Sequence, residues 1–391
     1  MRGMAAHLFS YIAMRLTGRY GMHYMKKIKK VILIEGILLV SLYTVFMTDK
    51  LKEGVKEEQT QAIEVGSVGE REYIKWVDFN VSYEALCEAY RWDVETYEEA
   101  LEKDAVHVDW IELLAYTGAR HGGEFPSGTV SEIARTAEKL KSGEATMQEL
   151  ARDMKYYAYY LEAYRAVLGG YVGEYEIQKE TEDGKVEWKK CYGLKAFSPI
   201  AKGFEYNDYD DFGASRSYGY ARPHLGHDMM GQIGTPVVAI ESGYVEAIGW
   251  NQYGGWRLGI RSFDGKRYYY YAHLRQNFPY YKGLEEGSVV TAGQVIGYMG
   301  HTGYSKTENV NNIKVVHLHW GLQLIFDESQ KEGNNEIWID CYNLTRFLYK
   351  NRSETAKDAE TKEWYRIYEM KDPAVEEYME GKNAGEATGG E

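Results

Sequence analysis

The sequence predicts a multidomain chain: an N-terminal transmembrane helix, then an all-α module, then a mainly antiparallel β domain. Three observations predict this order. An apolar run lies near the N-terminus, and apolar residues then recur every three or four positions to about residue 175. From about residue 176 to residue 339, glycines and alternating β-branched and aromatic residues dominate. These patterns are typical of a membrane span, of helices and of strands, respectively.

Length and charge narrow the class of protein. The 391 residues are 44% hydrophobic, which is enough for two or three domains with buried cores. The net charge is −13, although residues 1–30 hold seven lysines and arginines and no acid. An acidic body argues against nucleic acid as a partner. The three cysteines lie far apart, so the sequence predicts neither a disulfide framework nor a cysteine-rich zinc site.

Residues 31–47 are the predicted transmembrane helix. They are apolar except for Glu35 and a few small polar residues, and as a helix they would reach about 25 Å, the short end for a bilayer. Lysines end the preceding basic segment, residues 1–30, so the positive-inside rule places that segment in the cytoplasm and everything after about residue 50 outside the cell. A cleaved signal peptide and a buried core helix are the alternatives. Met25 is an alternative start.

The next segments are predicted from charge and periodicity. Residues 48–79 are charged and are interpreted as a linker. Residues 80–176 are the helical module, in which one apolar stripe consists of Tyr157, Leu161, Tyr164 and Leu168 and ends at Gly169 and Gly170. Such a stripe is typical of packing rather than of ligand binding. We expect the module to space or dock the rest of the chain, and it is a candidate site for a protein partner.

The remaining chain is divided at residue 350. Residues 177–350 are the predicted β domain with its preceding strands, and they include a short helix over 342–350. Residues 351–391 are a charged tail in which we expect a helix and a disordered Gly/Ala/Glu-rich end. Residues 207–211 are acidic, and a surface loop is a better interpretation than a cation site because a full set of spaced oxygen ligands is missing.

Five histidines form three short clusters in the β region. In the first cluster Pro223 and Gly226 disfavour a helix, so an extended chain would point His224 and Asp228 into one pocket and turn His227 away. We therefore expect His227 to lie beside the site or at the surface and not to bind metal.

The other two clusters are predicted strands. Alternation places Tyr269, Tyr271 and His273 on one face of the second cluster. In the third cluster it places His317 and His319 on one face, and it buries the apolar residues on the other, namely Leu318, Trp320 and Leu322.

The three clusters together contain the side chains that a catalytic zinc site needs. Imidazole nitrogen and carboxylate oxygen suit tetrahedral Zn²⁺, and a catalytic site uses three protein ligands with a fourth position for water. The metal then acidifies water and polarises a scissile carbonyl. Two histidines and one aspartate would fill the three positions, and two further histidines would remain to accept a proton and to stabilise an oxyanion.

Residues 220–326 resemble the LytM/lysostaphin-type zinc endopeptidases, which cut peptides in bacterial cell walls. The resemblance rests on a series of motifs in family order: His224, Gly226 and Asp228, then 234–239, 242–245, 250–255, 271–274, 292–297 and 300–303, and last His317 with His319. It implies a groove floored by an antiparallel sheet, with a smaller sheet and loops as its walls.

The same resemblance implies the roles of five residues. His224, Asp228 and His319 would bind Zn²⁺, and His273 and His317 would act as general base and transition-state stabilisers. One departure is the segment from Tyr304 to Val316, which is longer than the family usually has and predicts a longer groove wall.

The hypothesis is therefore a membrane-anchored zinc endopeptidase whose catalytic domain faces the cell wall. It would hydrolyse peptide bonds in peptidoglycan stems or cross-links by zinc-activated water, and its partners would be the peptidoglycan peptide and the cell membrane. The alternative is a non-catalytic scaffold that binds the wall or a partner in a division or sporulation complex. A secreted bacteriocin-like lysin is a third hypothesis, which the apolar run disfavours.

Overall fold

A computed structural model of the chain describes residues 65–68, 71–103, 105–217 and 221–388. The basic segment 1–30 and the predicted transmembrane helix 31–47 lie outside the described residues. Among the residues that are described, no helix combines the length and the apolar character needed to cross a bilayer.

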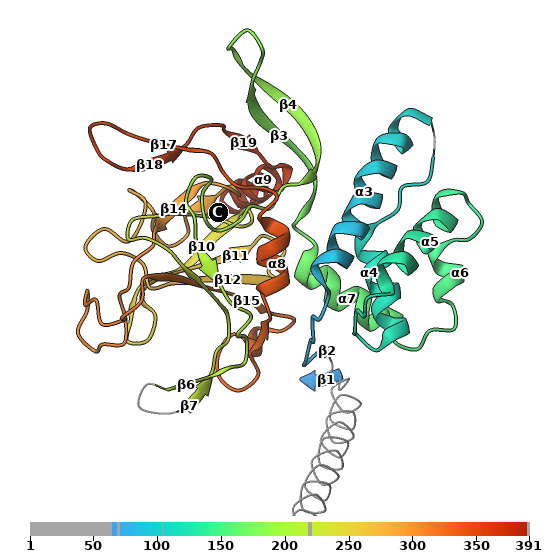
Figure 1. Cartoon of the computed structure of the whole chain (residues 1–391), viewed down its shortest axis with the longest axis horizontal. Coiled ribbons are helices and arrows are strands. Elements are labelled where there is room, and N and C mark those ends of the chain that lie inside the picture. The colour runs from blue at the N-terminus through green and yellow to red at the C-terminus, as the bar shows by residue number, and fades with distance from the viewer. Residues whose placement is uncertain (1–64, 69–70, 104, 218–220, 389–391) are drawn as a thin grey trace, which may run out of the picture. The chain divides into compact units, whose positions relative to one another are not determined.

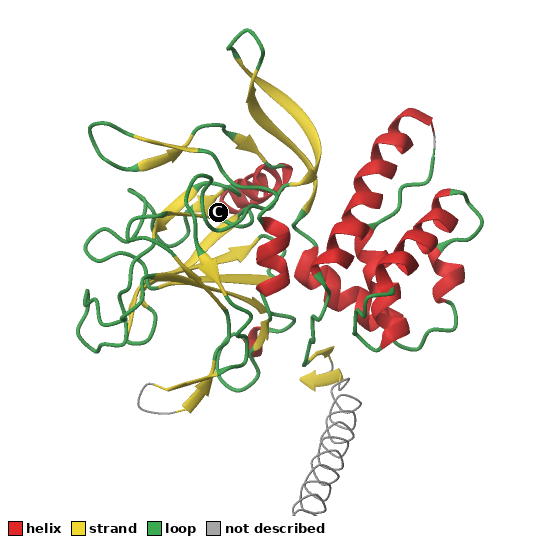
Figure 2. Cartoon of the chain, viewed as in Figure 1, coloured by secondary structure: helices red, strands yellow, loops and turns green. Residues whose placement is uncertain are grey.

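Helices and strands separate along the chain as predicted. The helices before residue 170 gather together, and strands make up most of the chain beyond it (Figure 1; Figure 2). A helical module and then a mainly antiparallel β domain are therefore confirmed.

The helical module contains α3 (Tyr83–Lys103), α4 (Trp110–His121), α5 (Thr129–Lys141), α6 (Met147–Ala151) and α7 (Tyr157–Leu168). Helix α4 shows how local sequence fixes these elements. The Asp109 side chain accepts hydrogen bonds from the backbone N–H groups of Ile111 and Glu112, which satisfies donors that the helix leaves open. Gly122 ends the helix in the left-handed conformation with φ 64°, which glycine adopts without steric cost.

The segment before α3 differs from the predicted linker. Strands β1 (Val65–Val68) and β2 (Arg71–Ile74) pair as a hairpin, and Ile74, Val77 and Phe79 are buried in the core. The Gln330 side chain donates a hydrogen bond of 2.7 Å to the Ile74 carbonyl. The linker prediction was wrong for residues 74–79, because three apolar side chains among charged ones suffice for packing but give no recognisable period.

An eight-stranded antiparallel sheet forms the centre of the β domain. Its strands run in the order β13–β10–β11–β12–β15–β8–β5, and β16 pairs with β15. Their bounds are β5 (Asn207–Asp208), β8 (His227–Met230), β10 (Gly243–Asn251), β11 (Gly255–Ser262), β12 (Arg267–Ala272), β13 (Val289–Val290), β15 (His317–Leu324) and β16 (Ile337–Ile339).

Strand β15 has one buried face, as its alternation predicts. Leu318, Trp320 and Leu322 are fully buried, and His317 and His319 lie on the opposite face, toward the groove. Helix α8 (Tyr342–Leu348), at the predicted position, packs beside the sheet (Figure 1). The face of the sheet that carries the histidines is therefore left to form a site.

Helix α8 joins the sheet to the helical module. On one side the indole nitrogen of Trp320 donates a hydrogen bond of 3.1 Å to the Thr345 hydroxyl. On the other, the Phe347 ring lies 5.5 Å from the Tyr90 ring and 5.7 Å from the Trp110 ring, measured between centroids. The sheet and the helices consequently share one hydrophobic core.

A buried ion pair adds a second connection between these parts. The Arg267 guanidinium donates to both carboxylate oxygens of Glu241, at 2.7 and 3.0 Å, and to the Ala166 carbonyl of α7 at 2.9 Å. The Tyr269 hydroxyl donates to the same carboxylate at 2.6 Å. Because these groups satisfy one another, the charges are tolerated in the core.

Smaller sheets surround the central one. Strands β3 (Val172–Glu180), β4 (Val186–Leu194) and β19 (Met370–Lys371) form one, and β9 (Pro236–Val238) pairs with β14 (Val295–Tyr298). The remaining pairs are β6 (Ser215–Ser217) with β7 (Ala221–Pro223), and β17 (Thr355–Lys357) with β18 (Trp364–Arg366).

The tail beyond residue 350 folds back on the β domain, and the prediction of a disordered end fails over its described residues. Helix α9 (Pro373–Thr388) comes after β19, and the Tyr378 ring stacks 5.7 Å from Tyr244 and 4.5 Å from Phe263. The buried Asp372 carboxylate accepts hydrogen bonds from Lys195 and Ser242. Composition missed this packing because few aromatic side chains make the contacts in a charged segment.

Candidate metal centre and groove

A groove of about 650 Å³ runs over the exposed face of the central sheet. Side chains from β8, β10, β11, β12 and β15 line it, together with Arg216 of β6 and Tyr304 of the long segment before β15. All five predicted site residues line this groove: three lie on strands, His273 directly follows β12, and His224 lies in the turn between β7 and β8. The groove therefore has an antiparallel sheet as its floor, as the family resemblance implies.

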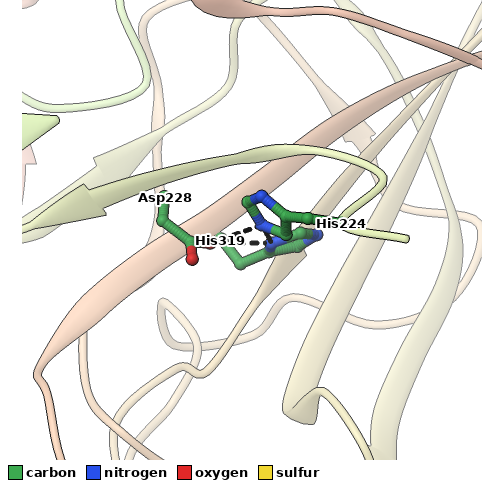
Figure 3. A group of neighbouring side chains, drawn as sticks. All are labelled: His224, Asp228 and His319. Atoms are coloured by element: carbon green, nitrogen blue, oxygen red, sulfur yellow. Dashed lines mark hydrogen bonds and ion pairs between the residues drawn. The ribbon is translucent and has the colours of Figure 1, made fainter. Parts of the chain in front are cut away.

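His224, Asp228 and His319 converge at one point of the groove (Figure 3). The Nε2 atom of His224 lies 3.0 Å from Asp228 Oδ1 and 3.0 Å from His319 Nδ1, and His319 Nδ1 lies 2.9 Å from the same carboxylate oxygen. Asp228 and His319 are direct partners in the β8–β15 register. Residues at the two ends of the β domain therefore meet, as the sequence predicts.

Gly226 makes this approach geometrically available. A Cβ atom at this position would lie 2.5 Å from His319 Cε1, 2.6 Å from His319 Nε2 and 2.8 Å from the Trp320 carbonyl oxygen. The turn between His224 and β8 can cross β15 so closely only because no side chain stands there.

The donor set fits Zn²⁺. Two imidazole nitrogens and one carboxylate oxygen suit the ion, and ligands of a tetrahedral zinc with bonds of about 2 Å lie about 3.3 Å apart, close to the separations found. Burial would raise the pKa of Asp228, but its contacts with His224 and His319 outweigh burial and hold that pKa well below its usual range. Asp228 is thus a carboxylate at neutral pH, which is the form that binds metal.

The pKa values of the two imidazoles shift in opposite directions, up for His224 and down for His319. Burial lowers the pKa of His319 more than the neighbouring Asp228 raises it. For His224, burial also acts to lower the pKa, but the hydrogen bond to Asp228 and the charges of Asp228 and Asp211 raise it.

His273 and His317 form a second pair beside the metal group. Their ring centroids lie 4.6 Å apart, and His317 Nε2 lies 3.7 Å from Asp228 Oδ1. His273 Nδ1 lies 3.0 Å from the Thr302 carbonyl and His317 Nδ1 lies 2.9 Å from the Val315 carbonyl. Each Nδ1 can donate to its carbonyl, which leaves each Nε2 available to the groove.

The predicted face of His273 was wrong. Tyr269 and Tyr271 point into the core, where their hydroxyls bind Glu241 and the Ile240 N–H, whereas His273 lines the groove. Strand β12 ends at Ala272, and His273 has φ 61°, in the left-handed region. Alternation of faces holds only inside a strand, so the backbone turn brings His273 to the side of Tyr270.

Burial and neighbouring charges keep His273 neutral. Burial lowers its pKa well below the usual histidine value, and the nearby His317 and His319 lower it further. A neutral imidazole with a free nitrogen is the form that accepts a proton.

Two supporting residues were missed by the sequence analysis. Asp211 Oδ1 lies 3.1 Å from His224 Nδ1, and Arg216 donates to Asp211 and, at 3.4 Å, to Asp228 Oδ2. A carboxylate on the far nitrogen of a histidine fixes the ring and makes it a better ligand. The acidic segment 207–211 was the signal, but it was interpreted as a surface loop.

The other histidine of the first cluster points away from the metal group, as alternation predicts. His227 is not at the surface, however: it is 2% exposed and does not line the groove, and its Nε2 lies 3.0 Å from Asp208 Oδ2. His301 does not line the groove, since its Nδ1 lies 2.7 Å from the Ile313 carbonyl within the long segment. Tyr304 in that segment lines the groove, and a wall longer than the family usually has stays a prediction.

Comparisons with known proteins agree with this site. Residues 222–335 match Peptidase family M23. The L-Ala–D-Glu endopeptidase of Bacillus subtilis is 37% identical over 150 residues, which are 38% of this chain and 42% of that protein. The glycyl-glycine endopeptidase ALE-1 of Staphylococcus capitis is 37% identical over 89 residues, which are 22% of this chain and 23% of that protein. The chain thus spans less than half the length of these curated relatives.

The chain is also similar to a solved structure. The catalytic domain of the antimicrobial peptidase lysostaphin from Staphylococcus simulans is 30% identical, and the alignment covers 36% of this chain and 92% of that domain, with a TM-score of 0.29.

Proposed function

We propose that the chain hydrolyses peptide bonds in peptidoglycan stems or cross-links, with Zn²⁺ bound by His224, Asp228 and His319, because residues 222–335 match Peptidase family M23 and these three side chains form one group. The observation that carries the proposal is the convergence of these three side chains in an open groove. The names of the relatives cited above supply the substrate class.

Each residue of the site has a task in this proposal. When bound, Zn²⁺ would supply a Lewis acid for the scissile carbonyl and lower the pKa of a water molecule. Asp211 would hold the His224 ring through Nδ1 and so orient its Nε2. His273 and His317 would divide two tasks between them: an unprotonated Nε2 would accept the proton of the attacking water, and a protonated Nε2 would donate a hydrogen bond to the oxyanion. Their Nδ1 contacts with carbonyls and the position of His317 beside Asp228 suit the pair to these tasks.

We also propose that residues 31–47 anchor the chain in the cell membrane as a single span, with the catalytic domain on the cell-wall side. The lysines that precede the apolar run and the cell-wall substrate of the catalytic domain support this orientation. Protease added to intact cells stripped of wall should then digest the catalytic domain and leave the basic segment. Recovery of the mature protein from the medium would contradict the anchor. The helical module remains the candidate surface for a protein partner.

The catalytic proposal is tested by removing one ligand. His319→Ala in the full chain should abolish both zinc retention, measured by mass spectrometry of the metal, and clearing of a peptidoglycan zymogram. His121→Ala is the matched control, because it removes a histidine that pairs with Glu132 at the end of α4, away from the groove. A chelator should stop clearing by the unchanged protein, and added zinc should restore it.

Two outcomes would contradict the proposal in different ways. If His319→Ala cleared peptidoglycan at the normal rate, the assignment of the metal ligands would be wrong. If the unchanged, zinc-loaded protein cleared nothing, the non-catalytic scaffold would be the better interpretation.

A further inference from the structure

Two arginines in the groove have no carboxylate partner within the part of the chain that the structure describes. Among the described residues, no side-chain hydrogen bond or ion pair is found for Arg257, and its Nη1 atom is buried without an acceptor. Arg222 donates from Nη2 to the Tyr304 hydroxyl at 2.8 Å, and its Nε atom is also buried without an acceptor. Partly buried charges without a partner carry a desolvation cost, so their presence needs a reason.

The other basic side chains in the groove are neutralised by acids. Arg216 pairs with Asp211 and lies 3.4 Å from Asp228, and Lys331 pairs with Glu246. The positive charge that is left on the described groove residues therefore belongs to Arg222 and Arg257.

The sheet register fixes the position of Arg257 relative to the metal group. Leu258 of β11 pairs with Tyr271 of β12, so Arg257 lies level with Ala272. Ala272 in turn pairs with His319 of β15, and His319 pairs with Asp228 of β8. Directly paired residues point to the same face, so this row crosses the groove floor. The backbones of Arg257 and His319 are two strand spacings apart, a distance of about 10 Å.

Arg222 approaches the same place from the groove wall. Its guanidinium lies 5.5 Å from the Tyr253 ring centroid and 5.6 Å from the Tyr304 ring centroid, and the Tyr304 ring is 6.1 Å from that of His273. The charges of both arginines act on the Tyr270 hydroxyl, where they oppose the rise in pKa that burial causes. Both arginines and Tyr270 thus line the same groove, and the Tyr304 ring lies between the Arg222 guanidinium and the His273 ring.

We propose that Arg222 and Arg257 form a carboxylate-binding subsite that selects peptides with a free carboxylate within about two residues of the scissile bond. The inference rests on the proposed function and names the substrate class more narrowly. Extended peptide advances about 3.3 Å per residue, so two residues cover about 7 Å from a bond held at His319, and the long Arg257 side chain spans the rest of the about 10 Å to its own backbone. Guanidinium and carboxylate form paired, charge-assisted hydrogen bonds, which the amide of the same residue cannot match.

The test compares two stem-like peptides that differ only in this group, one with the free carboxylate and one with its amide. The full, zinc-loaded chain should cleave the acid with a kcat/KM on the order of tenfold or more above that of the amide. In Arg257→Ala the ratio should fall toward one, mainly through loss of acid cleavage. Arg257→Lys keeps the positive charge but loses the two parallel N–H donors of the guanidinium, so it should give an intermediate ratio. This variant also serves as a control in case the alanine variant fails to fold.

Lys331→Ala is the matched control, because it removes a positive charge from the same groove that is already paired with Glu246. It should keep the preference for the acid. Calorimetric binding of both peptides to the metal-free chain gives a second readout that does not need turnover. Equal cleavage and equal binding of acid and amide by the unchanged chain would overturn the subsite.

This design separates the subsite from the catalytic proposal. Selective binding of the acid, lost in Arg257→Ala but without cleavage by the zinc-loaded chain, would support the subsite and overturn the proposed function. Cleavage of both peptides at equal rates would overturn the subsite and leave the proposed function intact.

Discussion

Replacing Gly226 by alanine should disable the metal centre with little change to the rest of the molecule. The new Cβ would lie 2.5 Å from His319 Cε1, so the imidazole must move by roughly 1 Å to regain van der Waals distance. The backbone of β15 offers no relief, because the Trp320 carbonyl oxygen stands 2.8 Å away on the same side. Gly226 does not have a positive φ, so the contact and not the backbone conformation is what opposes alanine.

The size of the effect can be worked from this displacement. A shift of about 1 Å in a catalytic group costs on the order of a hundredfold in rate. Overpacking of this kind destabilises a protein by about 1 to 3 kcal/mol, which leaves most of a typical domain's stability. We therefore expect Gly226→Ala to fold, to bind zinc at least tenfold more weakly and to clear peptidoglycan about a hundredfold more slowly.

The assay is a chelator competition for zinc, together with rates on purified peptidoglycan and thermal unfolding by circular dichroism. Gly128→Ala is the control, since that glycine has φ −77° and no atom within 4 Å of an added Cβ. Zinc affinity and turnover of Gly226→Ala equal to those of the control would refute the reasoning, because they would mean that His319 tolerates the new methyl group.

Two further predictions concern stability. The hydrogen bond between His107 and Asp93 is the largest cause of the raised pKa of His107. This contact should therefore stabilise the fold fully below the unfolded histidine pKa of about 6.5, and the stabilisation should be lost as the pH rises through the higher pKa of the folded state. Thermal unfolding across this window should show a loss of stability that His107→Asn lacks, and identical pH profiles would contradict it. Arg267→Ala should cost about 3 to 5 kcal/mol in urea unfolding, because it leaves the Glu241 carboxylate buried without its cation, and a loss below about 1 kcal/mol would show that water or another group replaces the arginine.

Much of the site was predictable because regular strands impose a period on their side chains. His317 and His319 face the groove while Leu318 and Trp320 are buried, as alternation requires. The prediction failed at His273, one residue beyond the end of its strand, where a left-handed backbone reverses the direction of the side chain. No period in the sequence marks such a residue.

Contacts between distant segments were the other source of error. Asp211 supports His224 across 13 positions, and Arg222 reaches Tyr304 across 82. Composition alone shows an acidic loop and a long insertion, and only the folded chain brings them to the groove. The burial of Ile74, Val77 and Phe79 was missed for the same reason, since isolated apolar residues carry no information about their partners.

The aromatic contact of α8 with the helical module limits how the molecule can be divided. Phe347 is completely buried, and it touches Tyr90 and Trp110 although it belongs to the helix that closes the back of the peptidase sheet. Cutting the chain between residues 176 and 177 would expose the Phe347 ring to solvent on one fragment and the Trp110 indole on the other. The helical module and the β domain therefore share one core across residue 176, and we expect a stably folded fragment to include residues well upstream of the family match.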